Sequence, residues 1–276
     1  MNIAIIGLAI LGAFIVLAIV AVGVTGRRQP SQRIYRHATV LFVAARRRDA
    51  DTRFDADGAL WTSRTLFTLI GAEDGYWTDF AILPPDLSAA SRLSTQVNLS
   101  DLFVAEVELT PVPAFALGVL RLRHRLGLTR RPTGPLPTAV DHIDGQPELL
   151  PTAESIARAQ AYVPRTPVTM VNFLEYHARA RGDAKDGRDA YLRYGREAFK
   201  AVHAVGGQFL FAGRITAVLV QPQNPGWQRE WDDLAAMIYP DPTAIFAMEQ
   251  FPFYRRALGD RDEGLKRTCV IATRTY

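Results

Sequence analysis

The chain has 276 residues and a mass of 30.6 kDa, with 48% hydrophobic and 22% charged residues. This composition excludes a disordered or collagen-like chain, and the length suits one large domain or two small ones. A single cysteine, Cys269, excludes an internal disulfide framework and any cysteine-based metal cluster. The net charge of +4 is modest, and the sequence contains no nucleotide-binding, metalloprotease or serine-hydrolase motif.

An uncharged apolar run extends from Ile3 to Val24. Its 22 residues would form a helix of roughly 33 Å, which is enough to cross a hydrocarbon core of about 30 Å. A cleaved signal peptide is the alternative, but no charge precedes the run and the run is long for that purpose. We therefore predict a transmembrane anchor over residues 1–26.

Seven arginines and no acidic residue lie between Arg27 and Arg48, directly after the apolar run. Because cytoplasmic flanks are enriched in basic residues, the sequence predicts a single-pass protein of the cell membrane with its soluble part in the cytoplasm. The same arginines would contact anionic headgroups. Nucleic acid is not expected as a partner, since no basic surface interleaved with aromatic residues supports it.

Residues 27–113 are predicted to form a degenerate ferredoxin-like half with several strands and one helix. Asp86 is placed to cap that helix, which would run to about Val97. The segment 46–64 is charged and weakly periodic, as a loop or a poor helix would be. Strands are predicted from apolar, β-branched and aromatic runs at His37–Ala45, Thr65–Gly71, Tyr76–Leu83 and Leu102–Thr110.

Residues 114–164 are predicted to be connecting helices and a proline-rich linker. Phe115, Val119, Leu122 and Leu126 share one helical face, which would either pack on the domain or lie on a membrane surface. The linker, residues 130–151, contains five prolines.

Residues 165–276 give the clearest pattern. A helix is predicted at Asp189–Val205, and a second one starts at Asp241-Pro242, breaks at Pro252 and resumes to Leu258. The order strand-helix-strand-strand-helix-strand is that of a ferredoxin-like unit, an antiparallel sheet with two helices on one face. The strands are predicted at Val168–Tyr176, Gln208–Val220, Asp233–Tyr239 and Arg267–Thr275.

Short motifs in this half resemble the domain of unknown function 1330 family, a branch of the dimeric α+β barrel superfamily. The matching residues are Val168–Leu174, Ala190-Tyr191, Tyr194-Gly195, Gly206-Gly207, Trp231-Asp232, Tyr239-Pro240, Tyr254, Arg261 and Gly264-Leu265. Asp260 stands where the family is expected to have a histidine, so any role of that histidine would be lost here.

The resemblance implies a barrel of two sheets, which the superfamily normally builds from two chains. Trp77-Thr78-Asp79 is echoed by Trp231-Asp232-Asp233, 154 residues later. We therefore predict the fold class α+β, as a tandem pseudo-dimeric α+β barrel of ferredoxin-like units behind one transmembrane helix, with a cavity between the sheets. The alternative is an unrelated N-terminal half and a C-terminal half that dimerises between chains.

Three polar residues are the candidate catalytic groups. Asn172 shares its strand face with Met170 and Leu174, so its amide either binds a cavity ligand or bonds a neighbouring strand. Asp232 would act as a base or bond a loop amide. Arg261 would bind a carbonyl or an anion, or form a salt bridge with an adjacent acid.

Four aromatic residues are the candidate substrate-binding groups. Trp231 would wall the cavity, and Tyr191 and Tyr194 lie on the buried stripe of the predicted helix, where core packing is the alternative. Tyr254 joins them through the family resemblance. No metal site is predicted: Asp55–Gly58 lacks the acids that a calcium loop needs, and the single histidines have no partners at ligand spacing.

The resemblance implies a cofactor-independent isomerase, cyclase or oxygenase, or a binding protein, for a small apolar carbonyl or aromatic metabolite. Haem is a remote option, because some superfamily members handle haem. The alternative is a non-catalytic, membrane-tethered interaction module that holds a protein partner, and the sequence leaves open whether the protein is an enzyme. A packed barrel interior would favour the module, and an open apolar pocket of several hundred Å³ would favour the ligand-binding protein.

Overall fold

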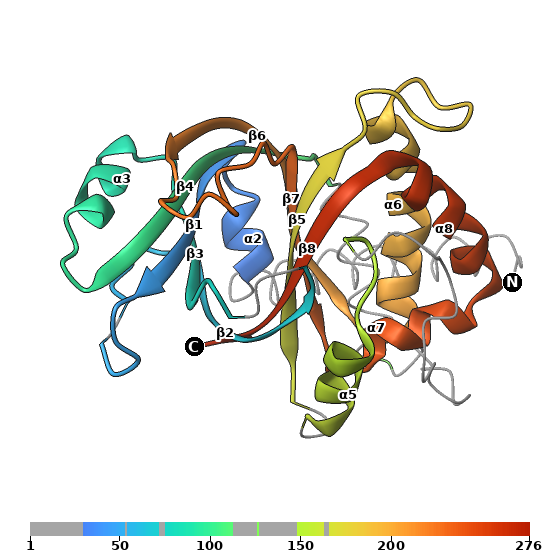
Figure 1. The fold of residues 1–276 in the computed structure, drawn as a ribbon, viewed down its shortest axis with the longest axis horizontal. Coiled ribbons are helices and arrows are strands. Elements are labelled where there is room, and N and C mark those ends of the chain that lie inside the picture. The colour runs from blue at the N-terminus through green and yellow to red at the C-terminus, as the bar shows by residue number, and fades with distance from the viewer. Residues whose placement is uncertain (1–29, 53, 72–74, 113–125, 127–147, 163–165) are drawn as a thin grey trace, which may run out of the picture.

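Eight antiparallel strands form one closed barrel in the order β1-β3-β2-β8-β5-β7-β6-β4 (Figure 1). The computed structural model describes residues 30–52, 54–71, 75–112, 126, 148–162 and 166–276. The strands are β1 (Thr39–Arg47), β2 (Trp61–Ile70), β3 (Asp79–Leu83), β4 (Leu99–Leu109), β5 (Val168–Tyr176), β6 (Gln208–Val220), β7 (Asp233–Tyr239) and β8 (Leu265–Thr275).

The barrel closes within one chain through two ladders between its N-terminal and C-terminal strands. β2 pairs with β8 from Ser63 opposite Thr275, and β4 pairs with β6 as far as Leu109 opposite Gly213. A closed sheet has no free edge strands, so its backbone groups are paired around the whole circumference.

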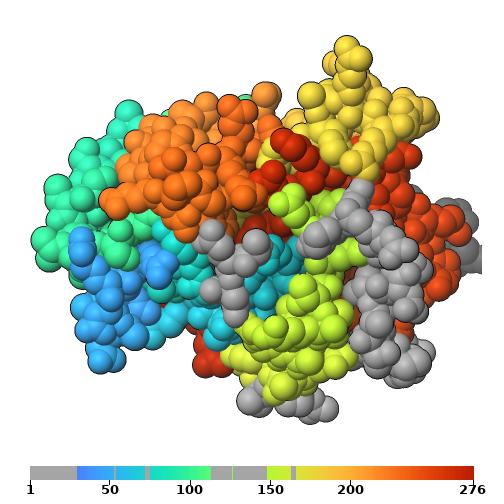
Figure 2. All heavy atoms as spheres, in the orientation of Figure 1, coloured from blue at the N-terminus to red at the C-terminus, as the bar shows by residue number. Residues whose placement is uncertain are grey.

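Helices cover the outside of the barrel, with α6 and α8 side by side on one flank and α3 on the other (Figure 1). In the same orientation, the residues of α5 lie against the β2 segment (Figure 2). The helices are α2 (Pro30–Ile34), α3 (Leu87–Ser94), α5 (Ala153–Ala161), α6 (Gly187–Ala204), α7 (Ala244–Ala247) and α8 (Pro252–Gly264), with a 3₁₀ turn, η1 (Met248–Gln250).

Two glycines set the close approach of α6 and α8. A Cβ atom on Gly187 would lie 2.6 Å from the carbonyl oxygen of Gly264, and one on Gly264 would lie 2.4 Å from that of Gly187. No larger residue fits at either position without moving backbone. This contact fixes the N-terminal end of α6 and therefore the side chains that α6 presents to the sheet.

The barrel interior is packed with aromatic side chains. Phe173 is fully buried at its centre, with ring centroids of five neighbouring aromatic residues 5.2 to 6.4 Å away. Those neighbours are Phe42, Phe80, Phe103, Trp227 and Trp231. The predicted cavity between two sheets is therefore wrong, because this cluster occupies the space.

The predicted fold class is corrected on the same grounds. The strands do not form ferredoxin-like α+β units in tandem but one closed eight-stranded antiparallel barrel. Local periodicity shows where strands lie, whereas the β2–β8 and β4–β6 pairings that close this sheet depend on contacts between distant residues. The domain boundaries at residues 26, 113 and 164 stay predictions.

The membrane description is not supported by the part of the chain that the structure describes. Within it, no helix combines the length and apolar character that a membrane span requires. The predicted anchor, residues 3–24, lies outside the described residues, as do most of the helix predicted at 115–126 and most of the linker at 130–151. The location and orientation that depend on the anchor stay predictions.

Most predicted elements are present, and three of them match at both ends: β5, β6 and β7. Asp86 caps α3 as predicted and accepts a hydrogen bond from the Ser88 amide, although the helix ends at Ser94. The cap predicted at Asp241 is wrong, because α7 begins at Ala244 and Asp241 accepts a bond from the Thr243 amide in a turn.

Candidate functional site

An apolar cavity of about 610 Å³ lies outside the barrel, between α6 and the outer face of β5, β6 and β7. Its walls are mainly aliphatic and aromatic, and we call it the tyrosine-lined cavity after its most frequent side chain. The residues of its wall that matter below are Asn172, Tyr176, Tyr191, Tyr194, Gly195, Phe199, Asp233 and Tyr254.

The cavity follows from the alternation of side chains along the strands. On β5, Phe173 points into the barrel, and the residues on either side of it point outward towards α6. Asn172 and Tyr176 therefore share the outer face. α6 is held opposite by its cap, in which the Asp186 carboxylate accepts a hydrogen bond of 2.8 Å from the Asp189 amide.

Four tyrosines form a row along the cavity. Ring centroids are 5.3 Å apart for Tyr176 and Tyr191, 5.3 Å for Tyr191 and Tyr194, and 5.8 Å for Tyr194 and Tyr254. Burial raises the pKa of all four phenols. The row is therefore neutral at physiological pH and offers hydroxyl groups rather than charge.

Tyr191 differs from its neighbours in the use of its hydroxyl group. The Tyr176 hydroxyl donates to Asp233 at 3.1 Å, and the Tyr194 and Tyr254 hydroxyls bond each other at 2.9 Å. Within the described ranges, the Tyr191 hydroxyl makes no hydrogen bond, although its residue lines the cavity. A phenol donor is thus available to a ligand among apolar walls.

Asp233 is the acidic group of the cavity. Its Oδ2 atom lies 3.2 Å from Arg188 Nη2 and accepts from the Tyr176 hydroxyl, and its side chain is 9% exposed. Burial raises the pKa of this carboxyl, and the Arg188 guanidinium opposes the rise. The carboxylate is held in place by both partners at the cavity wall.

Asn172 lies in the cavity wall. It also bonds a neighbouring strand, which was the alternative to ligand binding in the sequence analysis. Its Nδ2 atom donates to the carbonyl oxygens of Met170 at 3.0 Å and Ala235 at 3.2 Å. These bonds orient the amide, so that Oδ1 is the atom that remains for a ligand donor.

Asp232 and Trp231 are not brought to this cavity. Asp232 is exposed, and its Oδ2 atom accepts a hydrogen bond of 2.7 Å from the Tyr176 amide. Trp231 packs inside the barrel, 5.5 Å from the Phe173 ring and 5.9 Å from the Trp227 ring. Asp232 therefore bonds the backbone, and Trp231 packs in the core.

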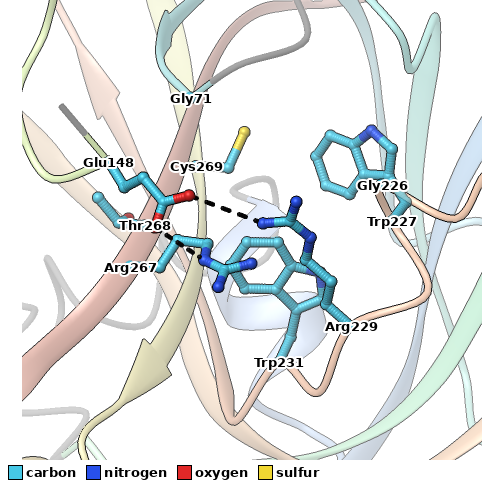
Figure 3. Close-up of a pocket in the computed structure, with 9 residues that line it drawn as sticks. All are labelled: Gly71, Glu148, Gly226, Trp227, Arg229, Trp231, Arg267, Thr268 and Cys269. Atoms are coloured by element: carbon cyan, nitrogen blue, oxygen red, sulfur yellow. Dashed lines mark ion pairs between the residues drawn. The ribbon is translucent and has the colours of Figure 1, made fainter.

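Trp231 also borders a separate small cavity of about 50 Å³ at one end of the barrel (Figure 3). Glu148 lies between two arginines there, 3.2 Å from Arg267 and 3.8 Å from Arg229. The space holds a few water molecules at most, so it does not suit a metabolite.

Arg261 forms a salt bridge with an adjacent acid, which was the predicted alternative to binding a carbonyl group or an anion. Its guanidinium lies 2.8 Å from the Asp262 carboxylate, and its side chain is 14% exposed. Arg261 is not among the residues that line the cavity. Its positive charge lowers the pKa of Tyr194 and Tyr254, against the larger raising effect of their burial.

The structure therefore brings together Asn172, Tyr191, Tyr194 and Tyr254 from the predicted set and adds Asp233 and Tyr176. A signal for Tyr176 was available, since the alternation that turns Asn172 outward also turns Tyr176 outward. Asp233 begins the strand predicted at Asp233–Tyr239, but the family resemblance pointed to its neighbour Asp232 as the candidate acid. The described residues contain no cluster of three histidine, cysteine or acidic side chains around a metal position.

Fold and site together define a closed antiparallel barrel with a largely apolar, tyrosine-lined cavity on its outer face. The chain matches no protein-family model and no curated protein. It is similar to two crystal structures of RPA0582, a protein of unknown function from Rhodopseudomonas palustris, one of them of the methylated protein. In both cases identity is 28%, the TM-score is 0.40 and 45% of this chain is covered, with 94% and 91% of those chains. The resemblance to the domain of unknown function 1330 family stays a prediction.

Proposed function

We propose that the protein binds a small, neutral, largely apolar molecule that carries a hydrogen-bond acceptor such as a carbonyl oxygen. The observation that carries this proposal is the free Tyr191 hydroxyl in an apolar cavity of about 610 Å³. Such a volume falls within the range of small-molecule sites, where a few polar groups orient an otherwise apolar ligand.

The electrostatics of the cavity favour a neutral ligand. The phenols are uncharged because burial raises their pKa, and Asp233 is already paired with Arg188. The two other charged residues that line the cavity, Arg196 and Lys200, are exposed to solvent. A charged group of a ligand beside the tyrosine row would therefore lose its hydration without gaining a buried opposite charge, which is costly. The packed barrel interior is what the alternative, a non-catalytic interaction module, leads us to expect, whereas the open apolar cavity outside the barrel supports ligand binding. The interaction module stays a prediction.

Asp233 favours a second candidate function, proton transfer next to a carbonyl group. In this proposal, Tyr191 donates a hydrogen bond to the carbonyl oxygen and Asp233 removes a proton from the adjacent carbon. The resulting enolate is stabilised by Tyr191, and the protonated Asp233 returns the proton to the substrate, as an isomerase requires. Asp233 thus takes the role expected of Asp232, and no cofactor enters the step.

The binding proposal is tested with two probes that differ in one group, 2-acetonaphthone and 2-ethylnaphthalene. We expect calorimetry to show tighter binding of the ketone to the wild-type protein. Tyr191→Phe should weaken ketone binding by roughly fivefold to tenfold, the effect of one hydrogen bond, and leave the hydrocarbon unchanged. Equal losses for both probes, or no ketone binding to the wild type, would contradict the proposal.

The catalytic candidate is tested by the exchange of the methyl protons of 2-acetonaphthone in D₂O, followed by NMR. We expect the wild-type protein to accelerate this exchange and Asp233→Asn to abolish the acceleration while ketone binding persists. Asp232→Asn is the matched control and should exchange at the wild-type rate. If the protein binds the ketone but does not accelerate the exchange, the binding proposal stands and the catalytic candidate is contradicted.

A further inference from the structure

Gly195 lies in the middle of α6, on the stripe that faces the tyrosine-lined cavity. Tyr191 precedes it by one turn and Phe199 follows it by one turn, and both rings also line the cavity. Because residues four apart are neighbours on a helix surface, the stripe has no side chain at the position between these two aromatic residues.

Neither packing nor backbone conformation requires glycine at this position. A Cβ atom on Gly195 would meet no atom of the described residues within 4 Å, and the backbone is not in the left-handed region. Gly187, in the same helix, contrasts with it, since a Cβ there would lie 2.4 Å from a backbone oxygen. Glycine inside a helix is less stable than alanine, so Gly195 weakens α6 without a structural reason.

We infer that a planar aromatic part of the ligand lies over Gly195, between the rings of Tyr191 and Phe199. This inference rests on the proposed function and narrows the ligand to an aromatic ketone or a similar aromatic molecule with an acceptor. A flat ring fits a slot one side chain wide, contacts the two flanking rings favourably and approaches the bare helix backbone closely. The acceptor then lies towards the free Tyr191 hydroxyl.

The test compares two glycine-to-alanine variants. Gly259, in α8, is the matched control: it is exposed, a Cβ there also meets nothing within 4 Å of the described atoms, and it does not line the cavity. Each substitution should raise Tm by about 2–4 °C, because alanine favours the helix. Gly195→Ala should weaken the binding of 2-acetonaphthone at least tenfold, whereas Gly259→Ala should leave it unchanged.

Two further probes test whether the ring of the ligand must be planar. Cyclohexyl methyl ketone keeps the carbonyl group but has a puckered, thicker ring. It should bind the wild-type protein at least tenfold more weakly than acetophenone, the planar ketone of nearly the same size.

The outcomes separate this inference from the function on which it rests. If the wild-type protein binds the ketones and Gly195→Ala binds them equally well, the position over Gly195 is not the aromatic subsite and the proposed function stands. Equal affinities for the planar and puckered ketones also overturn the inference alone. If the wild-type protein binds none of these ketones, both proposals fail together. A rise in Tm for both variants with loss of binding only for Gly195→Ala supports the inference.

Discussion

The two faces of the same strands are used in opposite ways. On β5, Phe173 is buried among five aromatic rings inside the barrel, whereas Asn172, one residue earlier, borders a cavity of about 610 Å³. On β7, Ala236 lies in the barrel cluster and Ala235 in the cavity wall. A packed interior stabilises the fold, and space left on the opposite face is available for a ligand.

This comparison indicates that the barrel interior is not the site. The superfamily resemblance placed a cavity between two sheets, but the aromatic cluster occupies that space. The site that we propose lies instead between α6 and the outer face of the sheet, where tyrosines and aliphatic residues line the cavity. Neighbouring residues on one strand should therefore respond very differently to substitution.

The largest expected difference is between Phe173→Ala and Asn172→Ala. Removing the Phe173 ring leaves a cavity at the centre of the core and should lower the free energy of unfolding by about 3–5 kcal/mol. Asn172→Ala removes two hydrogen bonds at the cavity wall and should cost about 1–2 kcal/mol. Urea unfolding of both variants measures the contrast, and similar losses would show that the two faces are equally packed.

The converse change, adding volume, should distinguish Ala236→Leu from Ala235→Leu. In the packed interior, the larger side chain at position 236 should destabilise the protein by about 1–3 kcal/mol. At position 235 the added atoms enter the cavity, so the loss should stay below about 1 kcal/mol while the binding of 2-acetonaphthone falls. Thermal unfolding measures the stability of both variants, and calorimetry measures their ketone binding. Equal destabilisation of the two variants would contradict the expectation that the cavity has room for the larger side chain at position 235.

The smallest expected effect is a pH dependence at the cavity wall. Burial raises the pKa of Asp233 in the folded protein above its ordinary value of 3.8. The folded state then binds a proton more readily than the unfolded state, which stabilises the fold at acid pH. This contribution is lost as the pH rises from about 4 through the raised pKa.

Asp233→Asn removes that group, so the wild-type protein should lose stability relative to the variant as the pH rises through this window. Parallel urea titrations between pH 4 and pH 8 would measure the difference in the free energy of unfolding. Asp232→Asn provides a comparison in the same direction: partial burial also raises the pKa of the Asp232 carboxyl, and the hydrogen bond from the Tyr176 amide opposes this rise. A constant difference between the wild type and Asp233→Asn across the window would contradict the raised pKa.

The sequence predicted the positions of strands and helices better than the pairing of the strands in the sheet. In a run such as Val168–Tyr176, the alternation of residues predicts a strand and the face to which each side chain points. Asp86 predicts the start of a helix because its side chain accepts a hydrogen bond from the amide of Ser88, two residues later. Barrel closure depends on pairs such as Ser63 with Thr275, which no local pattern encodes. The ferredoxin-like fold class failed for this reason.

The candidate site was predicted in part for the same physical reason. Strand and helix periodicity put Asn172 and Tyr191 on faces that meet, so they share the cavity. Trp231 and Asp232 lie just before β7, outside the strand, so the alternation of faces does not apply to them. Arg261 was chosen by resemblance, and its neighbour Asp262 was close enough to bind it.

The ladder between β2 and β8 has a consequence for how this chain is made. Ser63 pairs with Thr275, and the Trp61 indole donates to the Thr275 hydroxyl at 3.1 Å across a separation of 214 residues, so the barrel closes only after β8 has been synthesised. A ribosome adds about 5–20 residues per second, and pairings between distant residues form slowly. The aromatic interior therefore stays partly exposed until β8 pairs with β2 and β5, and in that interval the nascent strands are open to aggregation.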